Sequence, residues 1–482
     1  MRQHNSSVAK GHYCKIKVIK ERSTSRLIEE STNGTKTERS EKISQLTDME
    51  KVQDFQRKLY QKAKQEKGFR FYVLYDKVRS MTFLRESYRR VKANKGSAGI
   101  DNKTFEEIEK EGLEQYLQTI QKELETRSYK PSPVLKVYIP KANGGKRPLG
   151  IPTIKDRIVQ MSCKMVIEPI FEADFEDTSY GFRPKKSASQ AITKIKENLQ
   201  EGLTEIYDAD IKSYFDAIPH DKLMIVTSKR ISDRNVLHLI KMWLKSPKVE
   251  NGKISGGKKN KVGTPQGGVI SPLLANTYLN LVDKIVNKAG GSFKRIGIRI
   301  IRYADDFVLM GKEIPKEMIQ RLKAILENME LELNETKSKK IKAKEDPAEF
   351  LGFTIRYDKD IYGTNKKYWN IIPSKKAEKK IRENISELLH KGKHYQPEKL
   401  VKELNPKIRG WLNYYTIPKV SYPAMSQRRL RFYMTTKLWR YYNRKSQRKS
   451  RLYRQNAFGK LVSKYKLIDP TKMLKLPTLV NA

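Results

Sequence analysis

Two adjacent carboxylates, Asp305 and Asp306, are the residues most able to do chemistry in this chain. They stand between two apolar, β-prone segments, 298–301 and 307–309, a pattern that predicts two strands joined by a tight turn. A solvated turn is the usual interpretation of an isolated Asp pair, because Asp bonds nearby backbone in turns. Ionised carboxylates beside a core are unfavourable unless a cation offsets them, and Mg²⁺ takes carboxylate and phosphate oxygens as ligands. The pair therefore indicates a metal site, provided that a third carboxylate and a nucleotide site exist.

The third carboxylate is expected at the end of a predicted strand, residues 204–211, where Asp208 and Asp210 share one face. Asp216 follows at the start of a helix, where the helix dipole favours a carboxylate, so Asp210 is the preferred ligand. Three carboxylates at a strand end and a hairpin turn can hold two Mg²⁺ ions about 3.5–4 Å apart, which supports in-line phosphoryl transfer. Asp306 is the weaker candidate, since neighbouring residues seldom reach one ion equally.

The elements around these acids predict an α+β fold. A strand with Asp210 is followed by helices, a glycine loop at 263–268 with Gln266 as its one long polar group, an amphipathic helix and the Asp305–Asp306 hairpin. A further hairpin at 134–152 carries Lys141, Lys146 and Arg147 near its tip. Those cations suit a triphosphate, and a solvated basic turn is equally compatible with them.

Composition limits the classes of partner. The chain has 482 residues, with 100 Lys and Arg against 54 Asp and Glu and a formal net charge of +46, which favours nucleic acid. Cys14 and Cys163 are too few for a disulfide framework or a Cys-based zinc site. No apolar run approaches the length of a membrane span, and no signal-type segment opens the chain. We therefore expect an intracellular, bacterial protein without membrane contact; the basic, Ser-containing first twenty residues only weakly resemble an organellar transit peptide.

Four regions are expected along the chain. Residues 1–50 form a flexible basic extension, 51–373 the main α+β region, 374–445 a helical region and 446–482 a basic nucleic-acid-binding tail. In the helical region aromatic residues are interleaved with Lys and Arg. Such a face suits phosphate contacts and base stacking, whereas a bundle with an aromatic core and solvated Lys is the alternative; we expect both, with the aromatics mainly packing.

Several motifs in this order resemble the bacterial group II intron-encoded reverse transcriptases and maturases. The resemblance covers about 72–445, and a single Tyr-Ala-Asp-Asp would be a weak signal. The matching stretches are Ile139–Lys141 with Arg147–Pro152, Ser179–Pro184, Asp208–Asp216, Gly263–Gly268, Tyr303–Asp306, Phe350–Phe353 and Arg409–Tyr415.

The resemblance implies a right-hand polymerase with fingers, a palm of antiparallel sheet backed by helices, and an α-helical thumb or X domain. It implies RNA-templated DNA synthesis with two Mg²⁺, and binding of the intron RNA to help it splice. Its implied partners are the group II intron RNA, an RNA template with a DNA primer, a DNA target and dNTPs, in a cytoplasmic, nucleoid-associated ribonucleoprotein; the oligomeric state is left open.

Residue roles follow from the same resemblance. Catalytic residues are Asp210, Asp305 and Asp306, and the metal set adds Ile211 to them. The nucleotide set is Lys141, Arg147, Ile211, Phe215 and Gln266, where the Phe215 ring would exclude a 2′-hydroxyl. Lys337 is a candidate general acid, with a structural or phosphate-binding role as the alternative. The primer region is Phe350, Leu351, Gly352 and Phe353, and the RNA-binding thumb residues are Arg409, Trp411, Arg428, Arg429 and Arg431.

Two departures and two competing functions complete the expectation. Many relatives carry a C-terminal zinc-dependent endonuclease with paired Cys motifs; with no Cys after Cys163, we expect no such domain, and what would then prime synthesis stays open. Residues 1–50 match no known motif. A splicing factor with a decayed polymerase site is one alternative, and a reverse transcriptase recruited to host defence is the other. The acids Asp210, Asp305 and Asp306 favour the polymerase, because clustered acids are unfavourable to keep without metal.

Overall fold

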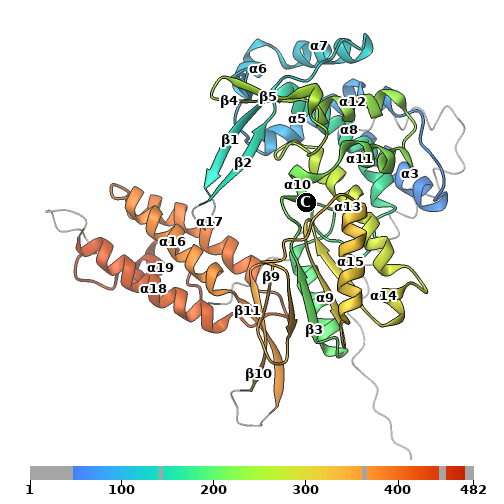
Figure 1. The fold of residues 1–482 in the computed structure, drawn as a ribbon. Coiled ribbons are helices and arrows are strands. Elements are labelled where there is room, and N and C mark those ends of the chain that lie inside the picture. Colours follow the sequence, from blue (N-terminus) through green and yellow to red (C-terminus); the bar gives the residue numbers. More distant parts are fainter. Residues whose placement is uncertain (1–46, 141–144, 361–365, 445–451, 473–482) are drawn as a thin grey trace, which may run out of the picture.

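The computed structural model describes residues 47–140, 145–360, 366–444 and 452–472. Its first part is helical (Figure 1), with α3 (Asp48–Gln65), α4 (Tyr75–Val78), α5 (Met81–Ala93), α6 (Phe105–Glu111) and α7 (Leu113–Glu125). Thr47 and Thr104 begin α3 and α6 with reciprocal bonds to Glu50 and Glu107, which satisfy main-chain N–H groups that a helix start leaves unpaired.

A four-stranded sheet extends from this helical part. It contains β1 (Val134–Pro140), β2 (Lys146–Ile151), β4 (Pro247–Glu250) and β5 (Lys253–Gly256), in the order β2-β1-β4-β5. The β1–β2 hairpin is antiparallel, with Ile139 opposite Arg147, so the predicted hairpin is confirmed. Residues 141–144 at its tip, including Lys141, lie outside the described residues.

The centre of the molecule is a second four-stranded sheet, ordered β6-β7-β3-β8. Its strands are β3 (Glu205–Ala209), β6 (Arg299–Tyr303), β7 (Asp306–Gly311) and β8 (Lys339–Lys342). Successive side chains of β7 enter different cores: Phe307 and Leu309 pack into the larger cluster with the helices, Val308 and Met310 into a second cluster. Because both faces of the sheet are covered at β7, this strand is apolar and buried from Phe307 to Met310. Residues 331–338 form a loop in which Leu333 makes an isolated bridge with Ile211, and β8 begins at Lys339.

Helices surround this sheet and connect it to the first one. They are α8 (Ile154–Glu172), α9 (Ala188–Gln200), α10 (Tyr214–Ala217), α11 (His220–Ser228), α12 (Arg234–Leu244), the short 3-10 helix η1 (Gly257–Lys259), α13 (Ser271–Asn287), α14 (Ser292–Arg295) and α15 (Lys316–Asn328). Helix α8 is buried over most of its length, which places it in the core between the N-terminal helices and the sheet.

A three-stranded sheet leads into the C-terminal helices. Strands β9 (Ala348–Phe350), β10 (Phe353–Lys359) and β11 (Lys367–Pro373) pair in the order β11-β10-β9 and share the second core with β7. Then follow α16 (Lys375–Lys391), α17 (Pro397–Tyr415), α18 (Ala424–Asn443) and α19 (Ala457–Tyr465). These four helices have a core of their own.

The basic tail expected over 446–482 contains a packed helix. Phe458 and Leu461 of α19, with Leu452 and Leu467 on either side, are buried in the core of the C-terminal bundle. The small apolar face of α19 lies among many cations, so charge masked it in the sequence. Within the described part of the chain, residues 452–472 therefore extend the bundle.

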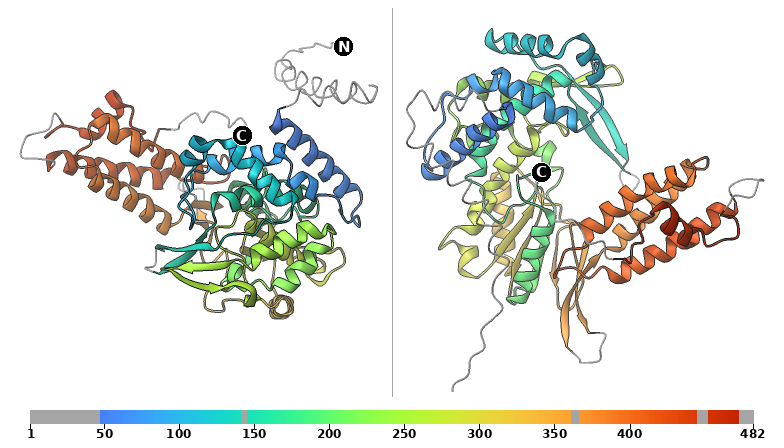
Figure 2. Two further views of the ribbon diagram at one scale, coloured as in Figure 1. Left: turned by 90° about the horizontal axis from the view of Figure 1, so that it is seen from above. Right: turned by 180° about the vertical axis from the view of Figure 1, so that it is seen from behind.

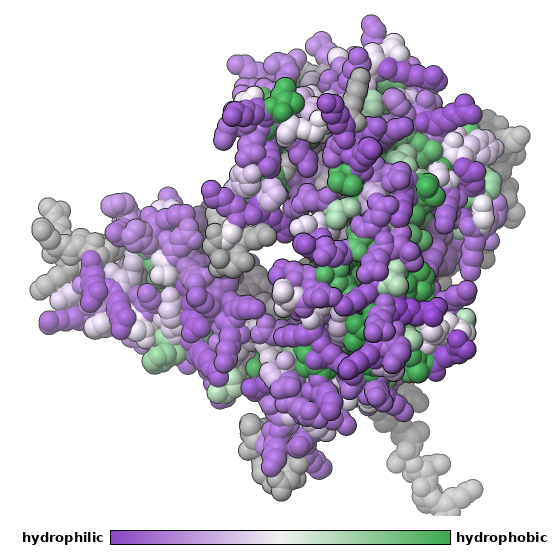
Figure 3. All heavy atoms as spheres, viewed as in Figure 1, coloured by the Kyte–Doolittle hydropathy of each residue, from purple (hydrophilic) through white to green (hydrophobic). Residues whose placement is uncertain are grey.

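The bundle projects to one side of the molecule, with β9–β11 beside it (Figure 2). In the space-filling view the molecule is hollowed between the bundle and the two sheets, and the residues around this opening are mostly hydrophilic (Figure 3). Mixed helices and antiparallel pairing agree with the predicted α+β class. In the part of the chain that the structure covers, every helix is too short or too polar to cross a membrane.

Candidate active site

Asp305 and Asp306 occupy the predicted hairpin. Tyr303 pairs with Asp306, so Ala304 and Asp305 form the turn between β6 and β7. Ala304 has φ of 60°, the positive value that tight hairpin turns require at their first central position. The turn places Asp305 at its tip and Asp306 at the start of β7.

Asp210 lies next to this turn because β3 pairs antiparallel with β7. The last pair is Ala209 with Phe307, and Asp210 is the next residue along. The loop before β8 holds its main chain: Asn334 N donates to Asp210 O at 2.7 Å, and Asp210 N donates to Ser338 Oγ at 3.1 Å. Strand pairing thus brings together the three acids that the sequence singled out.

The electrostatics of the cluster agree with close carboxylates. Burial of the carboxyl group among neighbouring atoms, followed by the charges of Asp305, Asp210 and Asp208, raises the pKa of Asp306 to about 6. The residue as a whole is nevertheless exposed to solvent. Burial is also the main cause that raises the pKa of Asp208 to about 6. For Asp305, burial raises the pKa, while Arg147 and Arg302 oppose the rise. Neighbouring acids that disfavour one another's charge would gain from a cation.

The donor set suits a hard divalent ion, since all three groups are carboxylates. The resemblance found in the sequence implies such a divalent metal ion. Among the residues described, no three acid, His or Cys side chains are already grouped as an ion would need them. Asp210 Oδ2 instead lies 3.3 Å from Lys337 Nζ, so the lysine ammonium group occupies part of the position expected for a metal ion. Ile211 has a buried side chain, which leaves only its main-chain groups for an ion or a nucleotide.

Arg147 of β2 contacts Gln266 of the glycine loop. Arg147 Nε donates to Gln266 Oε1 at 3.1 Å, and Gln266 Nε2 donates to Asp216 Oδ2 at 2.8 Å. Gly150 N donates to Gln266 O at 2.5 Å, and a side chain on Gly267 would collide with Gly150 O. The glycine loop therefore lets β2 approach closely, and Arg147 lies near enough to influence Asp305. Asp216 is in the first turn of α10, as expected.

Phe215 is buried, and its ring lies edge-on to Phe182 at a centroid distance of 6.5 Å. Phe182 is 53% exposed and has φ of 57°. The resemblance assigned Phe215 to the sugar of the nucleotide and gave no role to Phe182. Its exposure beside Phe215 is visible only in the fold.

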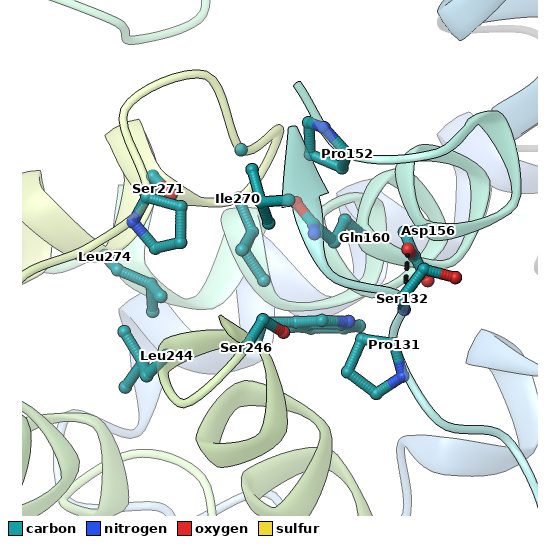
Figure 4. Close-up of a pocket in the computed structure, with 14 residues that line it drawn as sticks. Pro131, Ser132, Pro152, Asp156, Gln160, Leu244, Ser246, Ile270, Ser271 and Leu274 are labelled. Carbon is teal, nitrogen blue, oxygen red and sulfur yellow. Dashed lines mark hydrogen bonds between the residues drawn. The ribbon is translucent and has the colours of Figure 1, made fainter. Parts of the chain in front are cut away.

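A small pocket lies behind the glycine loop (Figure 4). Gln160 and Asp156 of α8 line it; Gln160 Oε1 accepts from Val269 N at 2.9 Å, and Asp156 Oδ2 accepts from Ser132 N at 3.0 Å. Its other lining residues are mainly apolar, including Ile270 and Leu274. It is packing that supports the loop, with none of the catalytic candidates in its wall.

The predicted primer region divides into buried and turn residues. Phe350 and Phe353 are buried, and the Phe353 ring stacks on Tyr414 at 5.8 Å. Leu351 and Gly352 form the β9–β10 turn with positive φ. The rings of Phe350 and Phe353 fill the second core, and the turn between them carries the exposed backbone. The primer role of residues 350–353 stays a prediction.

The predicted RNA-binding residues of the bundle also divide. Arg409 and Arg428 are exposed, Arg429 pairs with Glu378 at 3.2 Å, and Arg431 with Asp469 at 3.2 Å. Trp411 is 8% exposed and packs in the bundle core against Tyr415. This packing agrees with the expectation that the aromatic residues of the bundle mainly pack, and an RNA-binding role of Trp411 stays a prediction.

Three exposed residues of α18 were missed. Met425, Phe432 and Trp439 are 56%, 76% and 50% exposed and recur every seven residues, which places them on one helix face. Arg428 and Arg440 flank them, and α18 contains no acidic residue. The seven-residue spacing shows from the sequence that the three residues share a face of an acid-free helix, but it does not show that this face is exposed.

Comparisons with known proteins agree with this geometry. Residues 139–355 match the family "Reverse transcriptase (RNA-dependent DNA polymerase)", and residues 378–458 match "Group II intron, maturase-specific domain". "Protein YkfC" of Escherichia coli K12 is 34% identical over 364 residues, which cover 68% of this chain and 93% of that protein. "Group II intron-encoded protein LtrA" of Lactococcus lactis is 32% identical over 56% of this chain, which spans about half of LtrA (54%).

Among solved structures, a chain of a "Partial Cas6-RT-Cas1--Cas2 complex" has a TM-score of 0.34 and 22% identity over 53% of this chain and 40% of that one, too weak a likeness to carry an argument. The first matched region contains the acid cluster, and the second contains most of the C-terminal bundle, up to the start of α19. The predicted family is therefore confirmed, and the chain belongs to the group II intron-encoded reverse transcriptases that carry a maturase-specific domain.

Proposed function

We propose that this protein is an RNA-directed DNA polymerase that also binds its intron RNA, promotes splicing and supports intron mobility. One observation carries the proposal: β3, β6 and β7 bring Asp210 beside Asp305 and Asp306. The charge of Arg147 on β2 acts on this cluster, because it opposes the rise in the pKa of Asp305. A cluster of acids with a facing cation suits transfer of a nucleotide from a triphosphate.

The three bodies fit a right-hand arrangement. The N-terminal helices with the β2-β1-β4-β5 sheet would be the fingers, the β6-β7-β3-β8 sheet the palm, and α16–α19 the thumb. The hydrophilic opening between bundle and sheets would take the RNA template with its DNA primer (Figure 3). The DNA target of mobility would use the same basic surfaces.

Asp210, Asp305 and Asp306 would hold two Mg²⁺ ions, which when bound activate the primer 3′-hydroxyl and neutralise the triphosphate. Arg147 and Gln266 would orient the triphosphate of the dNTP, because they are already joined by a hydrogen bond of 3.1 Å. Lys141, outside the described residues, would add a second cation. Phe215 would exclude a 2′-hydroxyl, and Lys337 would lie near the leaving pyrophosphate.

The C-terminal bundle would bind the intron RNA. Arg428 and Arg440 on the α18 face supply phosphate contacts, and Phe432 and Trp439 supply exposed rings for unpaired bases. Arg409 lies on α17. This division leaves the aromatic core, Trp411 included, to hold the bundle together.

Primer extension on an RNA template with Mg²⁺ and dNTPs tests the proposal. Wild type should extend the primer, Asp305→Asn should not, and Asp346→Asn, which changes an exposed turn acid, should match wild type. Extension by Asp305→Asn at the wild-type rate would refute the assignment of the centre. If no protein extends a primer while RNA binding and splicing persist, the chain is a splicing factor without polymerase activity.

A further inference from the structure

A buried ion pair lies directly behind the turn that carries Asp305. Arg302 of β6 and Asp283 of α13 are both fully buried. Arg302 Nε lies 3.0 and 2.9 Å from the two carboxylate oxygens of Asp283, and its Nη2 lies 2.6 Å from Asp283 Oδ2. The guanidinium is thereby fixed in one orientation.

The other end of the guanidinium reaches the turn. Arg302 Nη1 donates to Ala304 O at 2.8 Å and to Asn276 Oδ1 at 2.8 Å. Ala304 has positive φ without being glycine, a conformation that surrounding contacts must maintain. Asp283 thus acts on the turn through Arg302.

Asn276 also holds the opposite side of the site. Its Nδ2 donates to Gly181 O at 2.7 Å. Gly181 packs so tightly on the turn that a Cβ there would collide with the main chain of Tyr303 and Ala304. The next residue is Phe182, whose ring lies beside Phe215. One asparagine of α13 therefore connects the acid turn with the loop that presents Phe182.

Stability alone does not explain this network. Burying an Arg–Asp pair carries a desolvation penalty, and apolar residues of similar volume often stabilise a core as well or better. In this network the polar groups of Arg302, Asn276 and Asp283 bond one another, and the network ends on the positive-φ turn. It therefore fixes the position of that turn. Catalysis at metal-bound phosphates is sensitive to displacements of about 1 Å.

We infer that Asn276 and Asp283 are positioning residues of the polymerase: they hold Arg302 and Gly181, and so set the position of the turn with Asp305. The inference rests on the proposed function. Neither residue touches the acids; they act through the main chain of residues 181 and 304.

The structure provides a matched control on the same strand. Arg299 of β6 donates from Nη1 to Asn198 Oδ1 at 2.8 Å, and Asn198 is fully buried in α9. Asn198→Ala therefore removes a partly buried Asn–Arg hydrogen bond on the same strand, away from the turn. Asn276→Ala and Asn198→Ala should both lower the melting temperature.

The two variants should differ in catalysis and in ion binding. We expect Asn276→Ala to lower kcat roughly 10- to 100-fold with the KM for primer–template unchanged, and Asn198→Ala to keep kcat within about twofold. Mn²⁺ binding, followed by electron paramagnetic resonance without nucleotide, should weaken for Asn276→Ala only. Equal kcat and equal Mn²⁺ affinity in the two variants would overturn the inference.

Asn276→Asp decides the matter if Asn276→Ala does not fold. The carboxylate of the variant can still accept the hydrogen bond from Arg302, but it has no N–H to donate to Gly181 O. We therefore expect kcat to fall while the fold is retained. Wild-type kcat in Asn276→Asp would refute the role of the Gly181 contact. Asp305→Asn separates the two proposals: if it stays active the proposed centre is wrong, and if it is inactive while both Asn276 variants keep wild-type kcat, only the positioning role fails.

Discussion

Lys337 Nζ lies 3.3 Å from Asp210 Oδ2, so an exposed lysine reaches into the acid cluster from the loop before β8. The lysine side chain is 67% exposed and can move away at little expense. The contact places a protein cation where the proposed metal would bind. Lys337 and a divalent ion should therefore compete for Asp210.

We expect Lys337→Gln to enlarge the stabilisation that Mg²⁺ gives to the protein, because Asp210 then has no lysine partner to release. The shift of the melting temperature on adding Mg²⁺ should be larger for Lys337→Gln than for wild type. The control is Lys342→Gln, which removes a lysine at the end of β8 that pairs with Glu345. An identical Mg²⁺ shift in all three proteins would show that Lys337 does not compete.

Phe215→Val should relax the choice between dNTPs and rNTPs, because a smaller side chain leaves room for the 2′-hydroxyl. Loss of packing volume in such a pocket changes discrimination by roughly 10- to 100-fold. The ratio of kcat/KM for dNTP and rNTP measures it. Tyr214→Phe, which removes only a buried hydroxyl bonded to Ala275 O, should keep the wild-type ratio. Unchanged discrimination in Phe215→Val would remove Phe215 from the sugar site.

Phe432→Ala and Trp439→Ala should weaken binding of single-stranded intron RNA by about 1–3 kcal/mol each, the range for loss of a stacked base. Arg428→Ala should instead reduce the slope of affinity against salt concentration, since it removes a phosphate contact. Fluorescence anisotropy at several salt concentrations separates these effects. Tyr72→Ala, at a residue 67% exposed on the far N-terminal region, is the aromatic control, and equal losses there would argue against an α18 site.

His220 should make the protein sensitive to acid. Burial lowers the pKa of His220, whose Nε2 lies 2.7 Å from Gly263 O of the glycine loop. As pH falls below about 6.5 the unfolded chain takes up a proton that the folded state resists, so stability is lost on acidification by at most about 1.4 kcal/mol per pH unit.

Replacement of His220 by Gln removes this titration and keeps a donor for Gly263 O. Urea unfolding at pH 7.5 and 5.5 should show a smaller loss of the free energy of unfolding for His220→Gln than for wild type. His390→Gln changes an exposed histidine and serves as the control. The same pH dependence in His220→Gln and wild type would contradict the prediction.

The sequence by itself predicted that Asp210, Asp305 and Asp306 lie close together, and strand pairing in the structure agrees. Side-chain alternation in the strands and the residues of the β6–β7 turn are local properties that can be read from the sequence. Together with the order of the elements they predicted one sheet for Asp210, Asp305 and Asp306, as the structure has it. The helical character of residues 374–445 was also predicted from the sequence, whereas α19 was not, because its small apolar face lies among many cations. Family membership rested on these motifs and was confirmed.

The tertiary structure alone decided which side chains are inside. Helix α18 has large apolar residues around its whole circumference, so periodicity did not show that Phe432 is exposed, just as it did not show that Trp411 of α17 is buried. The side chains that bond Arg302 of β6 come from helix α13. The contact of Arg147 with Gln266 joins positions 119 residues apart. Such contacts depend on how elements pack in space, and spacing along the chain carries no record of them.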